Sequence, residues 1–335
     1  MPKIWENNKA YLFLRRYVDW CTRRSYRSFR VEGSLPEGGA VLIAPNHTNT
    51  LMDALVVLAT RRSGTAFGAR ADVFSRPRIA RILHWMKIVP LVRERDGLRE
   101  VERNRETMAV IDDALAHGTP FCMFPEGRHR PMHSLLPLKK GISRMAFESA
   151  AARPTCIVPV GIEYSDFFHY RGTCRLRFGE PIDVNAFVAE HGDCGEAERH
   201  RALLQELSDR IKGLILYIPD DENYEATLRE ATGPRRRGWW RWPLAVLTLP
   251  LWLCAAVLSL PLWAAAESIC HFKIQDPAFR NTVRFAVRLV GEPLCLLLWA
   301  IPAFLLLPAW AACLVLLGCL FSYDAFYDWL NLVRQ

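Results

Sequence analysis

The chain has 335 residues, of which 51% are hydrophobic and 23% are charged, and its formal net charge is +8. This length fits one large domain or two ordinary ones. The basic charge comes without a zinc-finger spacing or an RNP-type aromatic strand, so nucleic acid is not the expected partner and a membrane surface is the better one.

The first 30 residues are predicted to form an amphipathic segment at a membrane interface. Residues 1–9 carry charged side chains but are not followed by the apolar core of a secretory signal, so no such signal is expected. Residues 10–30 combine aromatic and aliphatic side chains with arginines, the pattern of an amphipathic helix that lies on the bilayer or on the domain. Much of the excess positive charge lies in this segment, in Arg15, Arg16, Arg23, Arg24, Arg27 and Arg30.

Residues 31–233 alternate between short apolar runs and helical patterns. This alternation predicts an α/β domain with a mostly parallel central sheet flanked by helices. The predicted strands are 40–44, 88–92, 120–124, 157–160 and 175–178. The predicted helices are 50–62, 76–87, 99–116, 142–152 and 195–218, and residues 219–233 are predicted to be a polar linker.

Residues 234–335 are predicted to be a membrane region with a hydrophobic helical hairpin. Two runs, 243–266 and 293–321, contain 24 and 29 residues without a charge, and about 20 apolar residues suffice to cross a bilayer. Tryptophans beside Arg241 resemble an interfacial belt. Prolines leave open whether the two spans cross the bilayer or dip in and return: Pro250, Pro261, Pro302 and Pro308.

The ten cysteines form no CxxC pair and no metal-ligand spacing. We therefore expect reduced, mostly buried thiols in a cytosolic compartment and no metal site.

The stretch "APNHTNTLMDAL" (44–55) places a histidine and a carboxylate between a strand and a helix. His47 and Asp53 cannot share one helical face, because positions six apart are separated by about 240°. They can meet if the helix begins between them, at Asn49 or Thr50. A carboxylate on one imidazole nitrogen then makes the other nitrogen a general base. The alternative is that Asp53 only forms a capping box with Thr50.

Four ordered blocks resemble the motifs of the glycerolipid acyltransferase family, which includes 1-acyl-glycerol-3-phosphate acyltransferases. The blocks are "PNHTNTLMD", "IVPLVRERDG", "FCMFPEGRHR" and "IVPVGIEY", and the resemblance covers roughly residues 30–180. Two departures stand out. The family has four residues between His and Asp, whereas this sequence has five. The family's Glu-Gly-Thr-Arg motif reads Glu126-Gly127-Arg128-His129 here, so either Arg128 or Arg130 takes the role of the motif's arginine.

The resemblance implies transfer of a fatty acyl group from acyl-CoA or acyl carrier protein to a hydroxyl of a glycerol-based lysolipid, in phospholipid biosynthesis. The first candidate acceptor is 1-acyl-glycerol-3-phosphate. His47 would be the general base and Asp53 its orienting carboxylate. No metal and no cofactor beyond the thioester co-substrate is implied. The positions expected to bind substrate are Asn46, Arg93, Glu126, Gly127, Arg128, Arg130, Lys139 and Lys140.

Several alternatives remain open at this stage. The acceptor can be glycerol-3-phosphate or another lysophospholipid, and a non-catalytic, lipid-binding membrane scaffold is the candidate from a different class. An acyl-enzyme on Cys122 is disfavoured, because this residue lies mid-strand without a basic neighbour in sequence. The expected location is a bacterial-type inner membrane, with the catalytic domain facing the cytoplasm.

Overall fold

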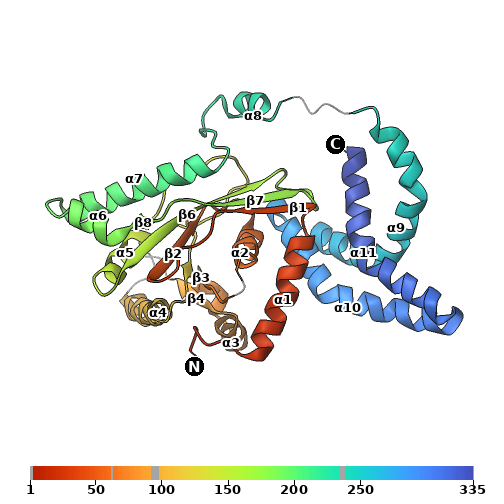
Figure 1. The fold of residues 1–335 in the computed structure, drawn as a ribbon, viewed down its shortest axis with the longest axis horizontal. Helices are drawn as coiled ribbons and strands as arrows, with labels where there is room; N and C mark the ends of the chain where they lie inside the picture. Colours follow the sequence, from red (N-terminus) through yellow and green to blue (C-terminus); the bar gives the residue numbers. More distant parts are fainter. Residues whose placement is uncertain (1–2, 62, 92–97, 234–237, 335) are drawn as a thin grey trace.

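The computed structural model describes residues 3–61, 63–91, 98–233 and 238–334, the side chains of 98–105 excepted. Its centre is an eight-stranded sheet in the order β1-β7-β6-β2-β5-β3-β4, with β8 paired to β6 (Figure 1). The strands are β1 (Ser28–Glu32), β2 (Ala40–Pro45), β3 (Ala66–Arg70), β4 (Ile88–Leu91), β5 (Phe121–Cys122), β6 (Thr155–Tyr164), β7 (Thr173–Phe178) and β8 (Ile182–Asp183). Only the pairs of β6 with β7 and with β8 are antiparallel. The mostly parallel α/β fold is therefore confirmed.

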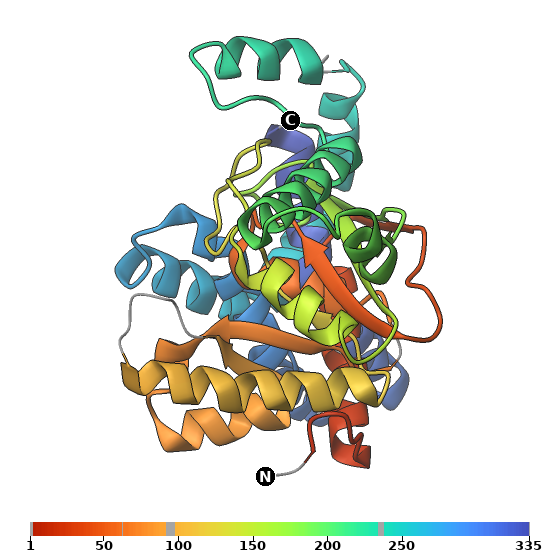
Figure 2. The same cartoon turned by 90° about the vertical axis from the view of Figure 1, so that its left-hand side faces the viewer.

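Helices cover both faces of this sheet, as the alternation of side chains along β2 requires. Ala40, Leu42 and Ala44 point into a core that α4, α5, α6 and α7 complete, and Figure 2 shows α4 and α5 in front of the strands. Val41 and Ile43 point into a second core against α1, α2 and α10. The helices before residue 234 are α1 (Lys9–Arg24), α2 (Thr50–Leu58), α3 (Pro77–Trp85), α4 (Leu98–Ala116), α5 (Gly141–Ala150), α6 (Val184–Glu190), α7 (Glu196–Leu214) and α8 (Tyr224–Thr232), with a 3₁₀ turn η1 (Ala71–Phe74).

The structure differs from the sequence-based expectation at both ends of this domain. Residues 28–30, assigned to the N-terminal amphipathic segment, belong to β1, which pairs with β7, so the sheet begins before residue 31. The polar linker 219–233 contains α8. The first difference arises from pairing with a distant segment, which local periodicity does not record.

The arginines of α1 do not all face a membrane surface. Arg15 is 4% exposed and donates to the carbonyls of Leu58, Arg61 and Ser63, at and beyond the last turn of α2. A guanidinium at the C-terminal end of a helix satisfies carbonyls that have no partner within the helix. Of the two expected positions for this helix, on the bilayer or on the domain, the contacts of Arg15 anchor α1 to the α/β domain.

The C-terminal region contains three long helices. They are α9 (Arg241–Phe272), α10 (Arg280–Leu306) and α11 (Ala309–Arg334), and a 3₁₀ turn, η2 (Pro277–Phe279), precedes α10. The apolar run 293–321 is not one span, because the chain turns at Leu307-Pro308. Leu307 is extended (φ −124°, ψ 153°), the conformation that a following proline favours. Pro250, Pro261 and Pro302 lie inside helices and do not end them.

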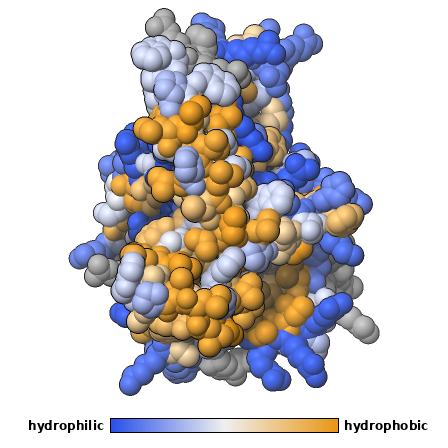
Figure 3. Space-filling view, turned by 90° about the vertical axis from the view of Figure 1, so that its right-hand side faces the viewer, coloured by the Kyte–Doolittle hydropathy of each residue, from blue (hydrophilic) through white to orange (hydrophobic). Residues whose placement is uncertain are grey.

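Each of these three helical segments is long and apolar enough to cross a membrane, judged by length and composition. They lie together on the right of Figure 1, away from α7, and this side of the molecule is largely apolar (Figure 3). The predicted apolar helices are thus present, although their number and bounds differ.

Candidate active site

The His47 loop lies where three parallel strands end. His47 follows β2 by two residues, and β2 is parallel to both β5 and β6, so their carboxyl ends meet at one edge of the sheet. Ligand sites of open α/β sheets form at such an edge, where loops leave the strands.

His47 and Asp53 are in direct contact at this edge. The distance from His47 Nδ1 to Asp53 Oδ2 is 2.8 Å, and the His47 side chain is 17% exposed whereas that of Asp53 is 0% exposed. The imidazole stacks on Phe124, with ring centroids 4.2 Å apart. A bond through Nδ1 leaves Nε2 as the nitrogen that can accept a proton.

The additional residue between His47 and Asp53 is absorbed at the start of α2. Asn49 has φ −135° and ψ 50°, and Thr50 has φ +46°. A positive φ is costly for a β-branched residue and persists where surrounding contacts impose it. Thr50 Oγ1 lies 2.8 Å from Thr282 Oγ1 of α10. The C-terminal region thus contacts the turn that brings Asp53 to His47.

Asp53 is held by more than the histidine. Its Oδ2 also accepts hydrogen bonds from the backbone N–H groups of Thr48 (2.8 Å) and Asn49 (2.7 Å). Its Oδ1 accepts one from the hydroxyl of Tyr164 (2.7 Å). Burial, together with the Asp53 charge, raises the pKa of Tyr164 well above its usual range, so this phenol stays protonated and donates.

Sequence reasoning missed Tyr164 as a site residue. It closes the fourth block, "IVPVGIEY", and lies on the same face of β6 as Val160 and Ile162. A tyrosine among buried aliphatic residues needs a partner for its hydroxyl, and that signal was available. Its partner is Asp53, whose carboxylate therefore serves as more than a helix cap.

Glu126 supports the histidine loop from the third block. One carboxyl oxygen accepts the backbone N–H of His47 (2.6 Å) and the other accepts that of Leu136 (2.9 Å). The residue is 2% exposed, and burial, only partly offset by these two donors, raises its pKa to about 7. This geometry assigns Glu126 to the support of the loop, and its contact with the acceptor stays a prediction.

We predict that Glu126 makes stability depend on pH. Its pKa lies above the 4.5 of an exposed glutamate, so its contribution is complete below pH 4.5 and is lost as the pH rises through about 7. The free energy of unfolding should fall over this range by up to about 3 kcal/mol relative to Glu126→Gln, which does not titrate. Denaturation of both proteins in detergent from pH 4.5 to 8 measures this. Parallel curves would contradict the raised pKa.

Three other predicted substrate residues, Asn46, Arg130 and Arg128, differ in the contacts that they make. The Asn46 side chain bonds both the N–H (2.7 Å) and the carbonyl (3.1 Å) of Ile162, so it joins β2 to β6. Arg130 pairs with Asp220 and donates to Ser134. Arg128 is exposed and makes no hydrogen bond or ion pair with the residues that the structure describes.

The remaining four positions give less structural information. Lys139 and Lys140 are exposed beside the third block, and the Lys139 N–H donates to the Pro125 carbonyl (2.8 Å). Gly127 has φ +71°, a left-handed conformation that glycine adopts without strain. Arg93 lies outside the described residues.

The C-terminal region reaches the rim of this site. His129 Nε2 lies 3.4 Å from Asp276 Oδ2, and its ring meets Phe279 edge-on. The same imidazole lies edge-on to His47, with centroids 5.8 Å apart. The loop between α9 and α10 therefore borders the catalytic histidine candidate.

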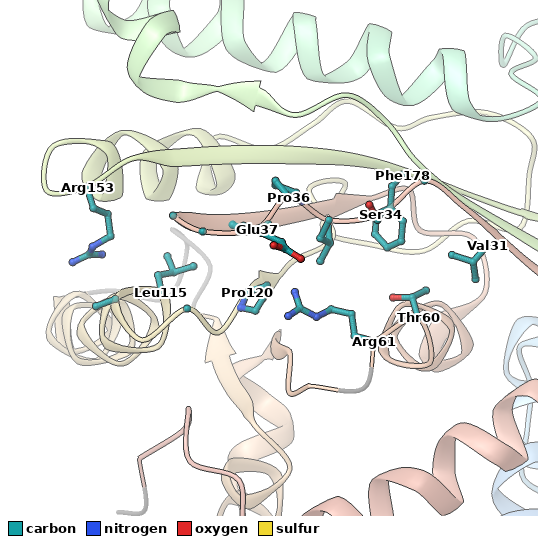
Figure 4. A pocket seen from close by; sticks show the side chains of 17 residues that line it. Val31, Ser34, Pro36, Glu37, Thr60, Arg61, Leu115, Pro120, Arg153 and Phe178 are labelled. Atoms are coloured by element: carbon teal, nitrogen blue, oxygen red, sulfur yellow. The ribbon is translucent and has the colours of Figure 1, made fainter.

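A separate cavity of about 730 Å³ lies at the opposite edge of the sheet (Figure 4). Glu37, Arg61 and Pro120 line it together with the start of β2. None of the predicted site residues belongs to it, and the six residues of β2 separate it from His47 by about 20 Å. This cavity is therefore not the candidate active site.

Cys122 is unsuited to covalent catalysis. It is 0% exposed, and burial raises the pKa of its thiol well above the usual range, which disfavours the thiolate that a nucleophile requires.

Comparison with known proteins agrees with the four blocks. Residues 28–163 match the family model described as Acyltransferase. Glycerol-3-phosphate O-acyltransferase 2 of Saccharomyces cerevisiae is 30% identical over 139 residues, 40% of this chain and 19% of that protein. Glycerol-3-phosphate O-acyltransferase 1 of the same yeast is 33% identical over 123 residues, 35% of this chain and 16% of that protein.

The chain spans less than a fifth of the length of these yeast relatives. Among solved structures, the 1-acyl-sn-glycerophosphate (LPA) acyltransferase PlsC from Thermotoga maritima aligns with a TM-score of 0.46 at 21% identity, over 61% of this chain and 79% of that one. The family match covers the segment that holds His47, Asp53 and Glu126. Residues 28–163 thus match an acyltransferase domain, in the segment where the four blocks predict one.

Proposed function

We propose that this protein is a membrane-bound O-acyltransferase that transfers a fatty acyl group from a thioester donor to a hydroxyl of a glycerol-based acceptor. The observation that carries the proposal is the contact between His47 and the buried Asp53 at the carboxyl edge of the sheet. A carboxylate held by four donors beside a partly exposed imidazole is suited to general-base chemistry. A non-catalytic scaffold gives no reason for such an arrangement.

The chemistry follows from this geometry. Asp53 accepts a hydrogen bond from the Nδ1–H of His47 and thereby fixes the tautomer of the imidazole. The unprotonated Nε2 then removes the proton from the acceptor hydroxyl. The resulting oxygen attacks the thioester carbonyl, and the carbon–sulfur bond of the tetrahedral intermediate breaks. The imidazolium then protonates the departing thiolate. Acyl-CoA or acyl carrier protein supplies the thioester, and the ester product and a free thiol leave.

The acceptor is proposed to be 1-acyl-glycerol-3-phosphate, as the motifs imply. Glycerol-3-phosphate is the second candidate, because both yeast relatives carry that substrate in their names. The two differ in one acyl chain, and the apolar C-terminal region bordering His129 gives an acceptor with such a chain a path from the bilayer.

Thiol release from acyl-CoA by the purified, detergent-solubilised protein tests this function. We expect release with 1-acyl-glycerol-3-phosphate, and weaker release with glycerol-3-phosphate and with a zwitterionic lysolipid. A faster reaction with glycerol-3-phosphate would select the second acceptor. Release without any acceptor would indicate a thioesterase, and no release with acyl-CoA or acyl carrier protein would favour a scaffold.

Arg128 is proposed as the cation that binds the acceptor phosphate. It is the arginine of the third block with no partner among the described residues, whereas Arg130 is engaged by Asp220 and Ser134. A guanidinium offers paired donors to phosphate oxygens.

We predict that Arg128→Ala raises the KM for 1-acyl-glycerol-3-phosphate by about 10- to 100-fold, the value of one or two charge-assisted hydrogen bonds. The KM for acyl-CoA should change little. Arg130→Ala is the matched control and should leave the acceptor KM within a few-fold. The reverse ranking of the two variants would assign the phosphate contact to Arg130.

A further inference from the structure

The C-terminal helices α10 and α11 form a hairpin with a charged base and an apolar tip. The charged residues of α10 precede Pro293, and those of α11 begin at Asp324. Between these two positions the chain carries no charge, and it turns at Leu307-Pro308. The two ends of the apolar stretch can therefore be placed relative to the catalytic domain.

Ion pairs fix the base of the hairpin beside the catalytic domain. Arg288 of α10 is 0% exposed, and its Nη1 lies 2.7 Å from Asp324 Oδ1 of α11. Arg24 of α1 joins the same carboxylate at 2.6 Å, and Arg171, between β6 and β7, pairs with Asp328. The chain thus enters and leaves the apolar stretch at the same level, next to α1 and the sheet.

Each whole helix is long enough to cross a bilayer, but the uncharged leg beyond the ion-paired base is short for one. The apolar part of α10, Pro293–Leu306, has 14 residues, and that of α11, Ala309–Tyr323, has 15. At about 1.5 Å per residue they extend about 21 and 22 Å, against about 30 Å of hydrocarbon. Legs of this length, starting at the interface beside the catalytic domain, pass the bilayer centre and end short of the opposite interface.

The tip has the composition of a segment that stays in hydrocarbon. Leu305, Leu306 and Trp310 are 78%, 80% and 70% exposed. The residues around the turn, 303–312, include no polar side chain that would favour the water beyond the opposite interface. The Leu307 N–H donates to the Ala303 carbonyl, and Pro308 has no N–H. The turn therefore exposes fewer backbone donors than an ordinary loop, as a lipid environment demands.

We infer that α10 and α11 form a re-entrant hairpin, which inserts into the bilayer from the side of the catalytic domain and returns to that side. Its partner is the acyl-chain region of the membrane, reached by the exposed leucines of both legs. The inference concerns the insertion of the chain and does not depend on the acyl-transfer chemistry.

A single reactive cysteine at the tip tests this topology. The exposed Cys254 and Cys313 are replaced by serine, Ala309→Cys is added, and the protein is probed with a membrane-impermeant maleimide in vesicles of both orientations. We expect no labelling from either side and full labelling in detergent. Ser34→Cys, on the exposed loop before β2, should be labelled from the catalytic side only. The background without an added cysteine is the blank.

Two labelling outcomes would overturn the inference. Labelling of Ala309→Cys from the side opposite Ser34→Cys would mean that the hairpin crosses the bilayer. Labelling from the same side would mean that it lies in water or at the near interface.

A positive readout of depth completes the test. A bimane attached to Ala309→Cys in proteoliposomes should be quenched about twofold more strongly by a nitroxide near the acyl-chain terminus than by one on the headgroup, because the tip ends in hydrocarbon. Stronger quenching by the headgroup nitroxide would place the tip at an interface. Absence of quenching by both would mean that protein, such as a second copy of the chain, covers the tip. Either result would contradict the inference.

Discussion

Replacing His47 with alanine is expected to lower kcat for acyl transfer by about 10²–10⁴-fold, the usual effect of removing a general base. In the proposed mechanism the imidazole takes the proton of the acceptor hydroxyl, and its Nδ1 is already bonded to Asp53. The side chain is partly exposed and stacks on Phe124, so its loss leaves the sheet core intact. Thiol release with saturating acyl-CoA and 1-acyl-glycerol-3-phosphate measures the effect.

His117→Ala is the matched control for this variant. His117 is an exposed imidazole just beyond the end of α4, 43% accessible, and its removal should leave kcat unchanged. The proton-transfer role would be wrong if His47→Ala, with unaltered circular dichroism and thermal midpoint, kept near-normal turnover. A loss of turnover together with the native circular dichroism would separate a catalytic effect from misfolding.

Asp53→Asn is expected to lower kcat by about 10²–10⁴-fold with little change of shape. An asparagine oxygen can take the place of the Asp53 Oδ2 that accepts from His47, Thr48 and Asn49. Its amide can face the Tyr164 hydroxyl, which is able to accept as well as donate. The variant thus keeps the hydrogen-bond geometry and loses the charge that stabilises the imidazolium.

Tyr164→Phe provides the comparison that separates charge from support. It removes one of the donors to Asp53 and should cost about 1–3 kcal/mol of stability, because a buried carboxylate oxygen loses its partner. Its kcat should fall much less than that of Asp53→Asn. Equal losses of kcat in the two variants would mean that Asp53 acts mainly by holding the loop.

The core of the fold was predictable because its signals are local. The strand 40–44 and the helices 99–116 and 142–152 correspond closely to β2, α4 and α5, since period-2 and period-3.6 patterns report which faces are buried. β1 was not predicted. Its sequence, Ser28–Glu32, alternates polar and apolar residues over only five positions directly after a helical pattern, and its partner strand β7 lies far away in the sequence.

The candidate site was predictable in part for the same reason. The motifs located His47, Asp53 and Glu126, and the strand-to-helix junction explained how two residues six apart can meet. The direction of each side chain was not accessible. Asn46 and Glu126 bond to backbone groups of neighbouring segments, contacts that the motifs do not record. The proposal of Arg128 over Arg130 required the position of Asp220.

The sequence by itself determined the chemical class of the site, the parallel α/β architecture and the apolar character of the C-terminal region, because motif order and hydrophobic periodicity are properties of adjacent residues. Only the tertiary structure decided that Tyr164 completes the Asp53 environment, that Thr282 contacts the strained turn at Thr50, and that Arg288 and Asp324 bring the ends of the hairpin together. These contacts join residues 36 to 232 positions apart. Their energies depend on burial and distance in space, which one-dimensional patterns do not carry.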